Sequence, residues 1–327
     1  MTFLQITHIS KLLDGIQIVD DISFEQQPFQ RIAIAGETGS GKSTLLKMIA
    51  GLVQPSAGEI IFNGKKIKGP DDQLIPGIRE IAYLSQHFEL RNSYRVEELL
   101  SYANQLSDEM ANAIFEVCMI NHLVKRKTDQ LSGGERQRIA IARLLISSPK
   151  LVLLDEPYSN LDLIHKNILK DVIREIGDTL KITCLLVSHD PTDILPWADD
   201  LMLMQQGKII QKGSPEQVYQ HPVNSYAASL LGNFQIVPPG LADTLLHFAG
   251  APSAGKSIFV RPGNFKITDA QHGLQAEVRS VRFMAGYYEI ELEVDAMILQ
   301  IHSMSRQIKT GATIYIALDT TTIQFLQ

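Results

Sequence analysis

The sequence predicts an α/β domain with a parallel sheet, followed by a small all-β domain. Residues 31–35 form a β-branched and apolar run, and residues 151–154 form a fully apolar one, as expected for strands buried on both faces of a parallel sheet. Short β-forming runs between residues 258 and 326, separated by turn-forming residues, indicate a small barrel or sandwich. We expect the first domain to span residues 1–234 and the second residues 235–327.

Composition narrows the class of protein. A chain of 327 residues with 45% hydrophobic residues has enough apolar material for two domains. Its net charge of −6 argues against a nucleic-acid binder, which is expected to show a basic field. No run approaches about 18 consecutive apolar residues and no basic-then-apolar leader is present, so we expect neither a membrane span nor export. Cys118 and Cys184 stand in apolar surroundings and are expected to be reduced core residues of a cytosolic protein.

A glycine-rich loop follows the first apolar run. Gly36, Gly41, Lys42 and Ser43 fill the pattern G-x-x-x-x-G-K-[ST] between a strand-like and a helix-like segment. Such a loop turns its backbone N–H groups inward, and the following helix N-terminus adds partial positive charge, so the loop can hold a di- or triphosphate. Lys42 is expected to reach the β- and γ-phosphates and Ser43 to ligate Mg²⁺. The expected phosphate-binding residues are Gly36, Glu37, Thr38, Gly39, Ser40, Gly41, Lys42, Ser43 and Thr44.

Residues 250–257 match the same pattern in a different context. The residues that follow, Ile258, Phe259 and Val260, are β-formers, and Pro262 disfavours a helix. We therefore interpret this second match as an accidental one in a loop.

Two acids follow the apolar run 151–154. Ligands of open α/β sheets bind beyond the carboxyl ends of the strands, where Asp155 and Glu156 are expected to lie. Asp155 is predicted to hold Mg²⁺, and Glu156 to polarise the attacking water in a phosphoryl transfer.

The segment LSGGERQR, residues 131–138, lies between these two motifs. Ser132, Gly133 and Gly134 open a predicted helix over residues 135–146, whose apolar residues recur at helical spacing. The exposed N-terminus of such a helix attracts phosphate.

Together, in this order, the three motifs resemble those of ABC-type ATPases. The resemblance implies a P-loop NTPase with a RecA-like core, an antiparallel β subdomain and a helical subdomain at about residues 90–148. It identifies Gln86 with the glutamine that touches Mg²⁺ and the lytic water, His189 with the histidine that contacts the γ-phosphate, and Asp162 with the D-loop aspartate. It also implies that Ser132, Gly133 and Gly134 cap the nucleotide of a second subunit, so that the active form is a head-to-tail homodimer closed by ATP.

One position departs from the family. Its members usually place an aromatic residue near the start of the domain to stack on adenine, and Leu13 occupies that position here. We expect plain apolar contact between Leu13 and adenine in its place.

The β tail resembles the TOBE domain, of OB type, that is attached to importer ATPases. The resemblance implies integral membrane permease subunits as partners, an external solute-binding protein acting indirectly, and a position on the cytoplasmic face of the cell membrane. The short tail favours an inorganic ion or a polyamine as the transported solute. Two alternatives are an exporter ATPase and an ABC-type ATPase acting on nucleic acid or ribosomes. The single cassette, without coiled-coil or zinc-bearing insertions, disfavours the latter.

Overall fold

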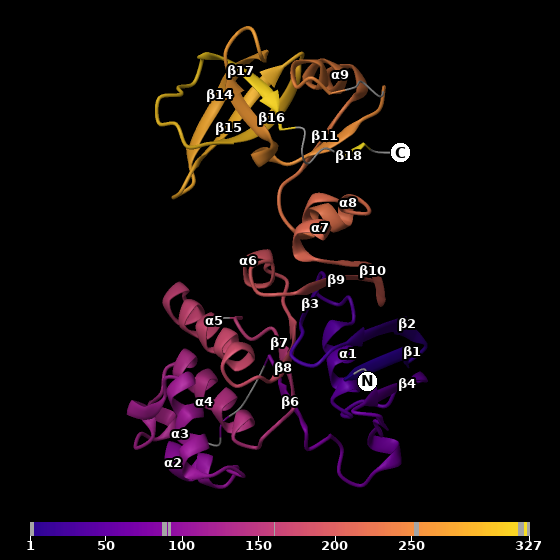
Figure 1. Ribbon diagram of the computed structural model, residues 1–327, viewed down its shortest axis with the longest axis vertical. Coiled ribbons are helices and arrows are strands. Elements are labelled where there is room, and N and C mark those ends of the chain that lie inside the picture. Colours follow the sequence, from indigo (N-terminus) through magenta and orange to yellow (C-terminus); the bar gives the residue numbers. More distant parts are fainter. Residues whose placement is uncertain are drawn as a thin grey trace. The chain divides into compact units, whose positions relative to one another are not determined.

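The computed structural model describes residues 3–86, 90, 93–159, 161–251, 255–319 and 324–325 (Figure 1). The chain forms two compact units, Met1–Val218 and Tyr219–Gln327. Within the described ranges, no helix is both long enough and apolar enough to cross a bilayer.

A six-stranded sheet forms the centre of the first unit, with the strand order β10-β9-β3-β8-β7-β6. Strands β6, β7, β8, β3 and β9 run parallel, and β10 is antiparallel at one edge. The strands are β3 (Arg31–Ala35), β6 (Ile81–Leu84), β7 (Leu151–Asp155), β8 (Thr183–Val187), β9 (Asp200–Gln205) and β10 (Lys208–Gly213). The buried runs at 31–35 and 151–154 are therefore parallel strands, as predicted, and every residue of β7 and β8 is buried.

A second, antiparallel sheet has the order β2-β1-β4-β5. Its strands are β1 (Leu4–Leu13), β2 (Ile16–Gln26), β4 (Ala57–Phe62) and β5 (Lys65–Lys66). Helix α1 (Lys42–Ile49) contacts both β2 and β7, so its buried side chains join the two sheets in one apolar core.

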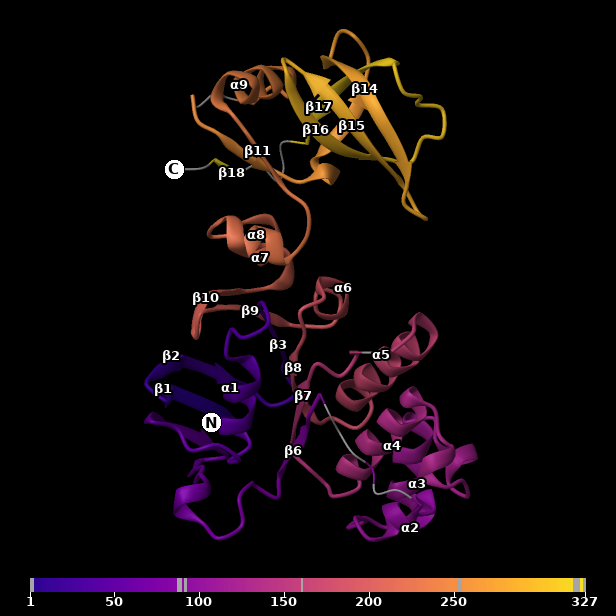
Figure 2. The same ribbon diagram turned by 180° about the vertical axis from the view of Figure 1, so that it is seen from behind.

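The other helices of the cassette lie across the central strands from α1 and the antiparallel sheet, as Figures 1 and 2 both show. They are α2 (Val96–Ser101), α3 (Asp108–Val117), α4 (Gly133–Leu145), α5 (Leu163–Asp178) and, after β8, the short α6 (Pro191–Ile194). Helices α2, α3 and α4 fall in the predicted helical subdomain, and α4 contacts α2, α3 and α5.

The second unit is mainly antiparallel β structure. A five-stranded sheet has the order β13-β17-β14-β15-β16, and a three-stranded sheet the order β11-β12-β18. The strands are β11 (Gln235–Val237), β12 (Ile258–Val260), β13 (Phe265–Thr268), β14 (Leu274–Phe283), β15 (Tyr288–Val294), β16 (Met297–Ser303), β17 (Thr313–Leu318) and β18 (Gln324–Phe325). Two short helices, α7 (Pro215–Gln220) and α8 (Ser225–Leu230), precede them.

The sequence did not predict helix α9 (Pro239–Phe248). Pro238, Pro239 and Gly240 are typical of turns, but Pro239 begins this helix, which packs on β14 and β17. Proline is well tolerated in the first turn, where its missing N–H has no helical partner. Leu241, Leu245 and Leu246 then recur at helical spacing and are buried.

The second match to the phosphate-loop pattern lies in this unit. Pro252, Ser253 and Ala254 are outside the described residues, and strand β12 begins at Ile258, so the prediction that a strand and not a helix follows this match is confirmed.

Candidate nucleotide-binding site

The predicted phosphate-binding and catalytic residues meet at the carboxyl ends of the parallel strands. A cavity of about 330 Å³ lies there. It is lined by Ile18, Thr38, Gly39, Gly41, Lys42, Ser43, Thr44, Gln86, Glu156 and His189. The residues come from five separate segments of the sequence, and the sheet topology brings them together.

The loop requires glycine where it enters α1. Gly41 has a φ of 100°, and a Cβ built on it would lie 2.4 Å from the Ile18 carbonyl oxygen. Any side chain would therefore be strained by the backbone conformation and would collide with β2. The close approach keeps the loop compact at the start of α1.

Lys42 is held inside the loop. Its side-chain ammonium donates to the carbonyl oxygens of Gly36, at 2.8 Å, and of Glu37, at 2.7 Å. Burial lowers the pKa of Lys42, while the negative charges of Glu156 and Asp155 act in the opposite direction. The loop thus positions a positive charge where phosphate oxygens can replace the carbonyl partners.

Asp155 links the loop to the sheet. Ser43 Oγ donates to Asp155 Oδ1 at 2.9 Å, and the Tyr83 hydroxyl donates to Asp155 Oδ2 at 2.8 Å. Burial, followed by the negative charge of Asp155, raises the pKa of Tyr83, which therefore stays a hydrogen-bond donor. Asp155 itself is 3% exposed, at the end of β7.

The donor set fits Mg²⁺ bound together with a nucleotide. The Ser43 hydroxyl and the Asp155 carboxylate are oxygen ligands at hydrogen-bond distance from each other. Within the described ranges, no group of three or more His, Cys, Asp or Glu side chains could form an all-protein metal site. Mg²⁺ is commonly held by one or two protein ligands, with phosphate oxygens and water completing its shell.

Glu156 and His189 form a pair beside the loop. His189 Nδ1 lies 2.8 Å from Glu156 Oε2. Glu156 has a φ of 50°, which is uncommon for a residue other than glycine, and its N–H donates to the Val187 carbonyl of β8. The strained backbone directs this carboxylate towards the cavity. Residues held in such conformations cluster at active sites.

Nine of the predicted nucleotide-binding residues do not line this cavity: Gly36, Glu37 and Ser40 of the loop, Asp155 at the end of β7, and five residues from other segments. Leu13 ends β1 and is 55% exposed, and Ile18 of β2 contributes the apolar wall of the cavity. Ser132, Gly133, Gly134 and Asp162 are the other four.

Ser132 and Asp162 cap two neighbouring helices. Ser132 Oγ accepts from the Glu135 N–H at the start of α4, and Asp162 Oδ1 accepts from the His165 N–H at the start of α5. A Cβ on Gly134 would lie 2.6 Å from the His165 ring, whose Nδ1 is 2.7 Å from Asp162 Oδ2. The signature segment and Asp162 therefore form one exposed cluster.

Sequence reasoning missed Ile18 and Tyr83. Tyr83 lies on β6, beside β7, and its alternation with Ala82 and Leu84 is the signal that could have placed it on one face of the sheet. No comparable signal marks Ile18, because its position against Gly41 depends on how the two sheets meet.

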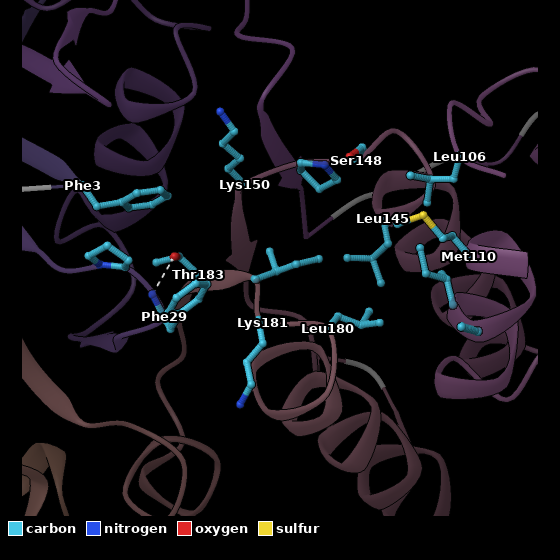
Figure 3. A pocket seen from close by; sticks show the side chains of 15 residues that line it. Phe3, Phe29, Leu106, Met110, Leu145, Ser148, Lys150, Leu180, Lys181 and Thr183 are labelled. Carbon is cyan, nitrogen blue, oxygen red and sulfur yellow. Dashed lines mark hydrogen bonds between the residues drawn. The ribbon is translucent and has the colours of Figure 1, made fainter.

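A larger apolar cavity of about 410 Å³ lies at the opposite, amino ends of β7 and β8 (Figure 3). Figure 3 shows Phe3 and Phe29 on one side of it and Leu106 and Met110 on the other, and the Phe29 N–H donates to Thr183 Oγ1 at 2.9 Å. None of the predicted site residues lines it.

Comparisons with known proteins agree with these observations. Residues 19–159 match the ABC transporter family. The chain is 31% identical, over 92% of its length and 90% of the relative's, to the spermidine/putrescine import ATP-binding protein PotA of Desulfitobacterium hafniense. It is 29% identical to the sulfate/thiosulfate import ATP-binding protein CysA of Synechococcus elongatus, covering 91% of this chain and 88% of that one. It is also 29% identical to the Fe(3+) ions import ATP-binding protein FbpC of Escherichia coli O157:H7, covering 96% and 94%.

A solved structure supports the same conclusion. The ADP conformation of MJ1267, an ATP-binding cassette of an ABC transporter, aligns with a TM-score of 0.59 and 25% identity, over 69% of this chain and 98% of that one. The chain therefore belongs to the ATP-binding subunits of ABC importers, the ATPases that power these transporters.

Proposed function

We propose that the cavity binds Mg-ATP, that two copies of the chain close head to tail on two nucleotides, and that hydrolysis reopens them to drive solute import. The observation that carries this proposal is the contact between Ser43 Oγ and Asp155 Oδ1, which joins the phosphate loop to the acidic end of β7 beside Glu156.

The phosphate loop binds the nucleotide. Residues 36–44 surround the phosphates with backbone N–H groups, and the Lys42 ammonium leaves the Gly36 and Glu37 carbonyls for the β- and γ-phosphates. Ser43, Asp155 and Gln86 would hold Mg²⁺, which would neutralise negative charge that develops on the phosphates. Leu13, exposed at the β1–β2 hairpin, and Ile18, in the cavity wall, offer apolar contact to the base.

Glu156 positions and polarises the attacking water. Its carboxylate is mostly buried and is oriented by His189 at 2.8 Å. His189 is itself exposed to the cavity, and it contacts the γ-phosphate once ATP is bound. Gln86, on the segment after β6, touches the same water.

A second copy completes each site. Ser132 and Gly133 are exposed and, with the buried Gly134, open a helix whose N-terminus attracts phosphate; all three lie outside the cavity of their own chain. Across a homodimer they cap the partner's ATP, with Asp162 alongside. This arrangement explains why the cluster is built but does not line the cavity.

Importer ATPases work with membrane permeases, and one surface of the cassette suits such a contact. Leu52, Leu74 and Ile75 are exposed apolar side chains, and Leu52 and Ile75 line a cavity of about 570 Å³ that also reaches Tyr83. Exposed apolar patches mark interaction sites. We propose that the permease subunits dock here and on the helical subdomain, on the cytoplasmic face of the membrane, and receive solute from an external binding protein.

The cargo we propose is an inorganic ion or a polyamine. Relatives named for spermidine/putrescine, sulfate/thiosulfate and Fe(3+) import support this range. The cassette has no solute site in this proposal, because the permease carries the solute.

The test is Glu156→Gln. We expect this variant to bind ATP but to hydrolyse it at least about 100-fold more slowly than the wild type, because the attacking water loses its base. Sedimentation with Mg-ATP should convert the variant from monomer to dimer, because the closed state no longer decays.

Lys42→Ala is the matched control. Without the ammonium, ATP affinity should fall, and no dimer should form at the same nucleotide concentration. Hydrolysis by Glu156→Gln near the wild-type rate would show that another group positions the water. An unchanged sedimentation profile with ATP bound would contradict the dimer.

A further inference from the structure

A network of two lysines and two aspartates, centred on the buried Asp193, adjoins His189 in the sequence. Lys166 and Lys170 stand one turn apart on α5, and Asp190 and Asp193 follow His189 at the start of α6. Lys166 Nζ lies 2.6 Å from Asp190 Oδ2 and 2.8 Å from Asp193 Oδ1, and Lys170 Nζ lies 2.8 Å from Asp193 Oδ1.

Asp193 is the centre of this network. Its side chain is 2% exposed, and a carboxylate buried to this extent requires charged partners. Both lysines supply them, and Ser188 Oγ donates to its second oxygen at 3.3 Å. The two ammonium groups balance the charge of the two carboxylates, so the network is neutral without an ion pair to His189 or Glu156.

The network fixes the backbone on both sides of His189. Ser188 contacts Asp193, and its Oγ also accepts from the Asp190 N–H at 3.1 Å. Asp190 accepts from Lys166. The His189 side chain is 64% exposed and contacts Glu156, so the direction of the ring depends on this backbone.

The same lysine is anchored next to the exposed cluster at the start of α5. The Lys166 N–H donates to the Asp162 carbonyl at 2.9 Å, in the first turn of the helix. A contact at Asp162 therefore acts on the helical turn from which Lys166 reaches the His189 segment.

We propose that Lys166, Lys170 and Asp193 are positioning residues for hydrolysis, which hold His189 against Glu156 and link it to the Asp162 end of α5. This inference rests on the proposed roles of Glu156 and His189. None of the three residues lines the nucleotide cavity, so they act through His189 and not on ATP.

The experiment is a comparison of steady-state ATPase kinetics for Lys166→Met and Asp193→Asn in the full chain. Each change keeps the approximate shape of the side chain and removes its charge. We expect kcat to fall about 10- to 100-fold, as for a misplaced catalytic group, with the ATP affinity within about twofold of wild type because the phosphate loop is untouched.

Two further variants separate positioning from general loss of structure. Lys166→Arg, which keeps a cation, should restore most of kcat. Arg174→Met is the matched control on the same helix, because it breaks an exposed pair with Asp171. It should leave kcat and affinity near wild type, as exposed pairs contribute little.

A double variant guards against failure to fold. If Asp193→Asn alone is unstable, Lys166→Met with Asp193→Asn should fold better, because one positive and one negative charge are removed together and the network stays neutral, yet kcat should stay low. Three results would overturn the inference. They are a folded Lys166→Met variant with wild-type kcat, a variant that loses ATP affinity but keeps its kcat, and a Lys166→Arg variant whose kcat is as low as that of Lys166→Met. Glu156→Gln serves as the reference. If this variant still hydrolyses ATP, the proposed function itself is contradicted. If Glu156→Gln loses ATPase activity while Lys166→Met keeps it, only the positioning role is contradicted.

Discussion

Asp155 has both carboxylate oxygens engaged, one by the phosphate loop and one by the core. Ser43 donates to Oδ1 and Tyr83 to Oδ2, and the group is almost fully buried. A buried carboxylate is stable only when its lone pairs meet donors. Tyr83 therefore satisfies the second oxygen of Asp155 and helps to fix the orientation of its carboxyl group beside Ser43.

Tyr83→Phe tests this dependence. Removal of the hydroxyl leaves Asp155 Oδ2 without its donor, so we expect the free energy of unfolding to fall by about 1–3 kcal/mol. Urea unfolding measures the change. Tyr102→Phe, at an 82% exposed residue, should leave stability unchanged. Equal stability of the two variants would mean that water replaces the tyrosine at no cost.

At the same scale, sequence reasoning placed the residues that lie within motifs but not those that depend on distant contacts. Gly41, Lys42, Ser43, Asp155 and Glu156 stand in local patterns whose spacing follows from a strand, a tight loop and a helix. The partners Tyr83 and Ile18 come from other strands, and their closeness arises only after the sheets form. The roles of all these residues stay predictions until variants are measured.

Among the elements, α4 and α5 depend on their close approach at Gly134. A Cβ added to Gly134 would lie 2.6–2.9 Å from three atoms of the His165 side chain, one of which is the Cβ of His165. The ring cannot move away freely, because His165 belongs to the capped first turn of α5. Glycine is thus required by packing between two helices, in addition to any role towards phosphate.

Gly134→Ala should therefore destabilise the first unit by about 1–3 kcal/mol, as overpacking does elsewhere. Gly133→Ala is the matched control, because nothing lies within 4 Å of its added Cβ. Thermal unfolding of both variants without nucleotide separates packing from phosphate binding. Similar melting temperatures for the two would show that the helices can separate at little cost.

Helices and strands were predicted correctly where the spacing of apolar residues along the sequence agreed with their burial. The run at 151–154 became a fully buried strand, and the stretch from 258 to 326 formed several short strands, as predicted. Helix α9 was missed because Pro238, Pro239 and Gly240 are also turn residues, and only the packing of the following leucines decides for a helix.

For the whole molecule, the decisive feature is that the signature cluster lies outside the cavity of its own chain. In the dimer that we propose, each ATPase site therefore combines the cavity of one copy with the signature segment of another. In a closed two-fold dimer each interface supplies both parts, so the two sites form together.

Mixing two inactive variants tests this arrangement. Lys42→Ala disables the phosphate loop, and Gly133→Glu places a negative charge at the helix N-terminus where phosphate is expected. In a mixed dimer one site combines both defects, but the other combines an intact loop with an intact signature. We expect the mixture to regain ATPase activity that neither variant shows alone. Activity absent from the mixture, with mixed dimers demonstrated by sedimentation, would contradict shared sites.

The burial of the two native cysteines allows site-specific fluorescent labelling of the protein. Cys118 and Cys184 are fully buried, and burial raises the pKa of each thiol to about 12. Almost no thiolate exists at neutral pH, so neither sulfur reacts readily with maleimides. A single cysteine introduced at Leu163, 72% exposed beside Asp162, would then be labelled selectively in the otherwise natural chain. With a donor dye on one copy and an acceptor dye on another, fluorescence energy transfer would report in real time whether nucleotide brings the two copies together.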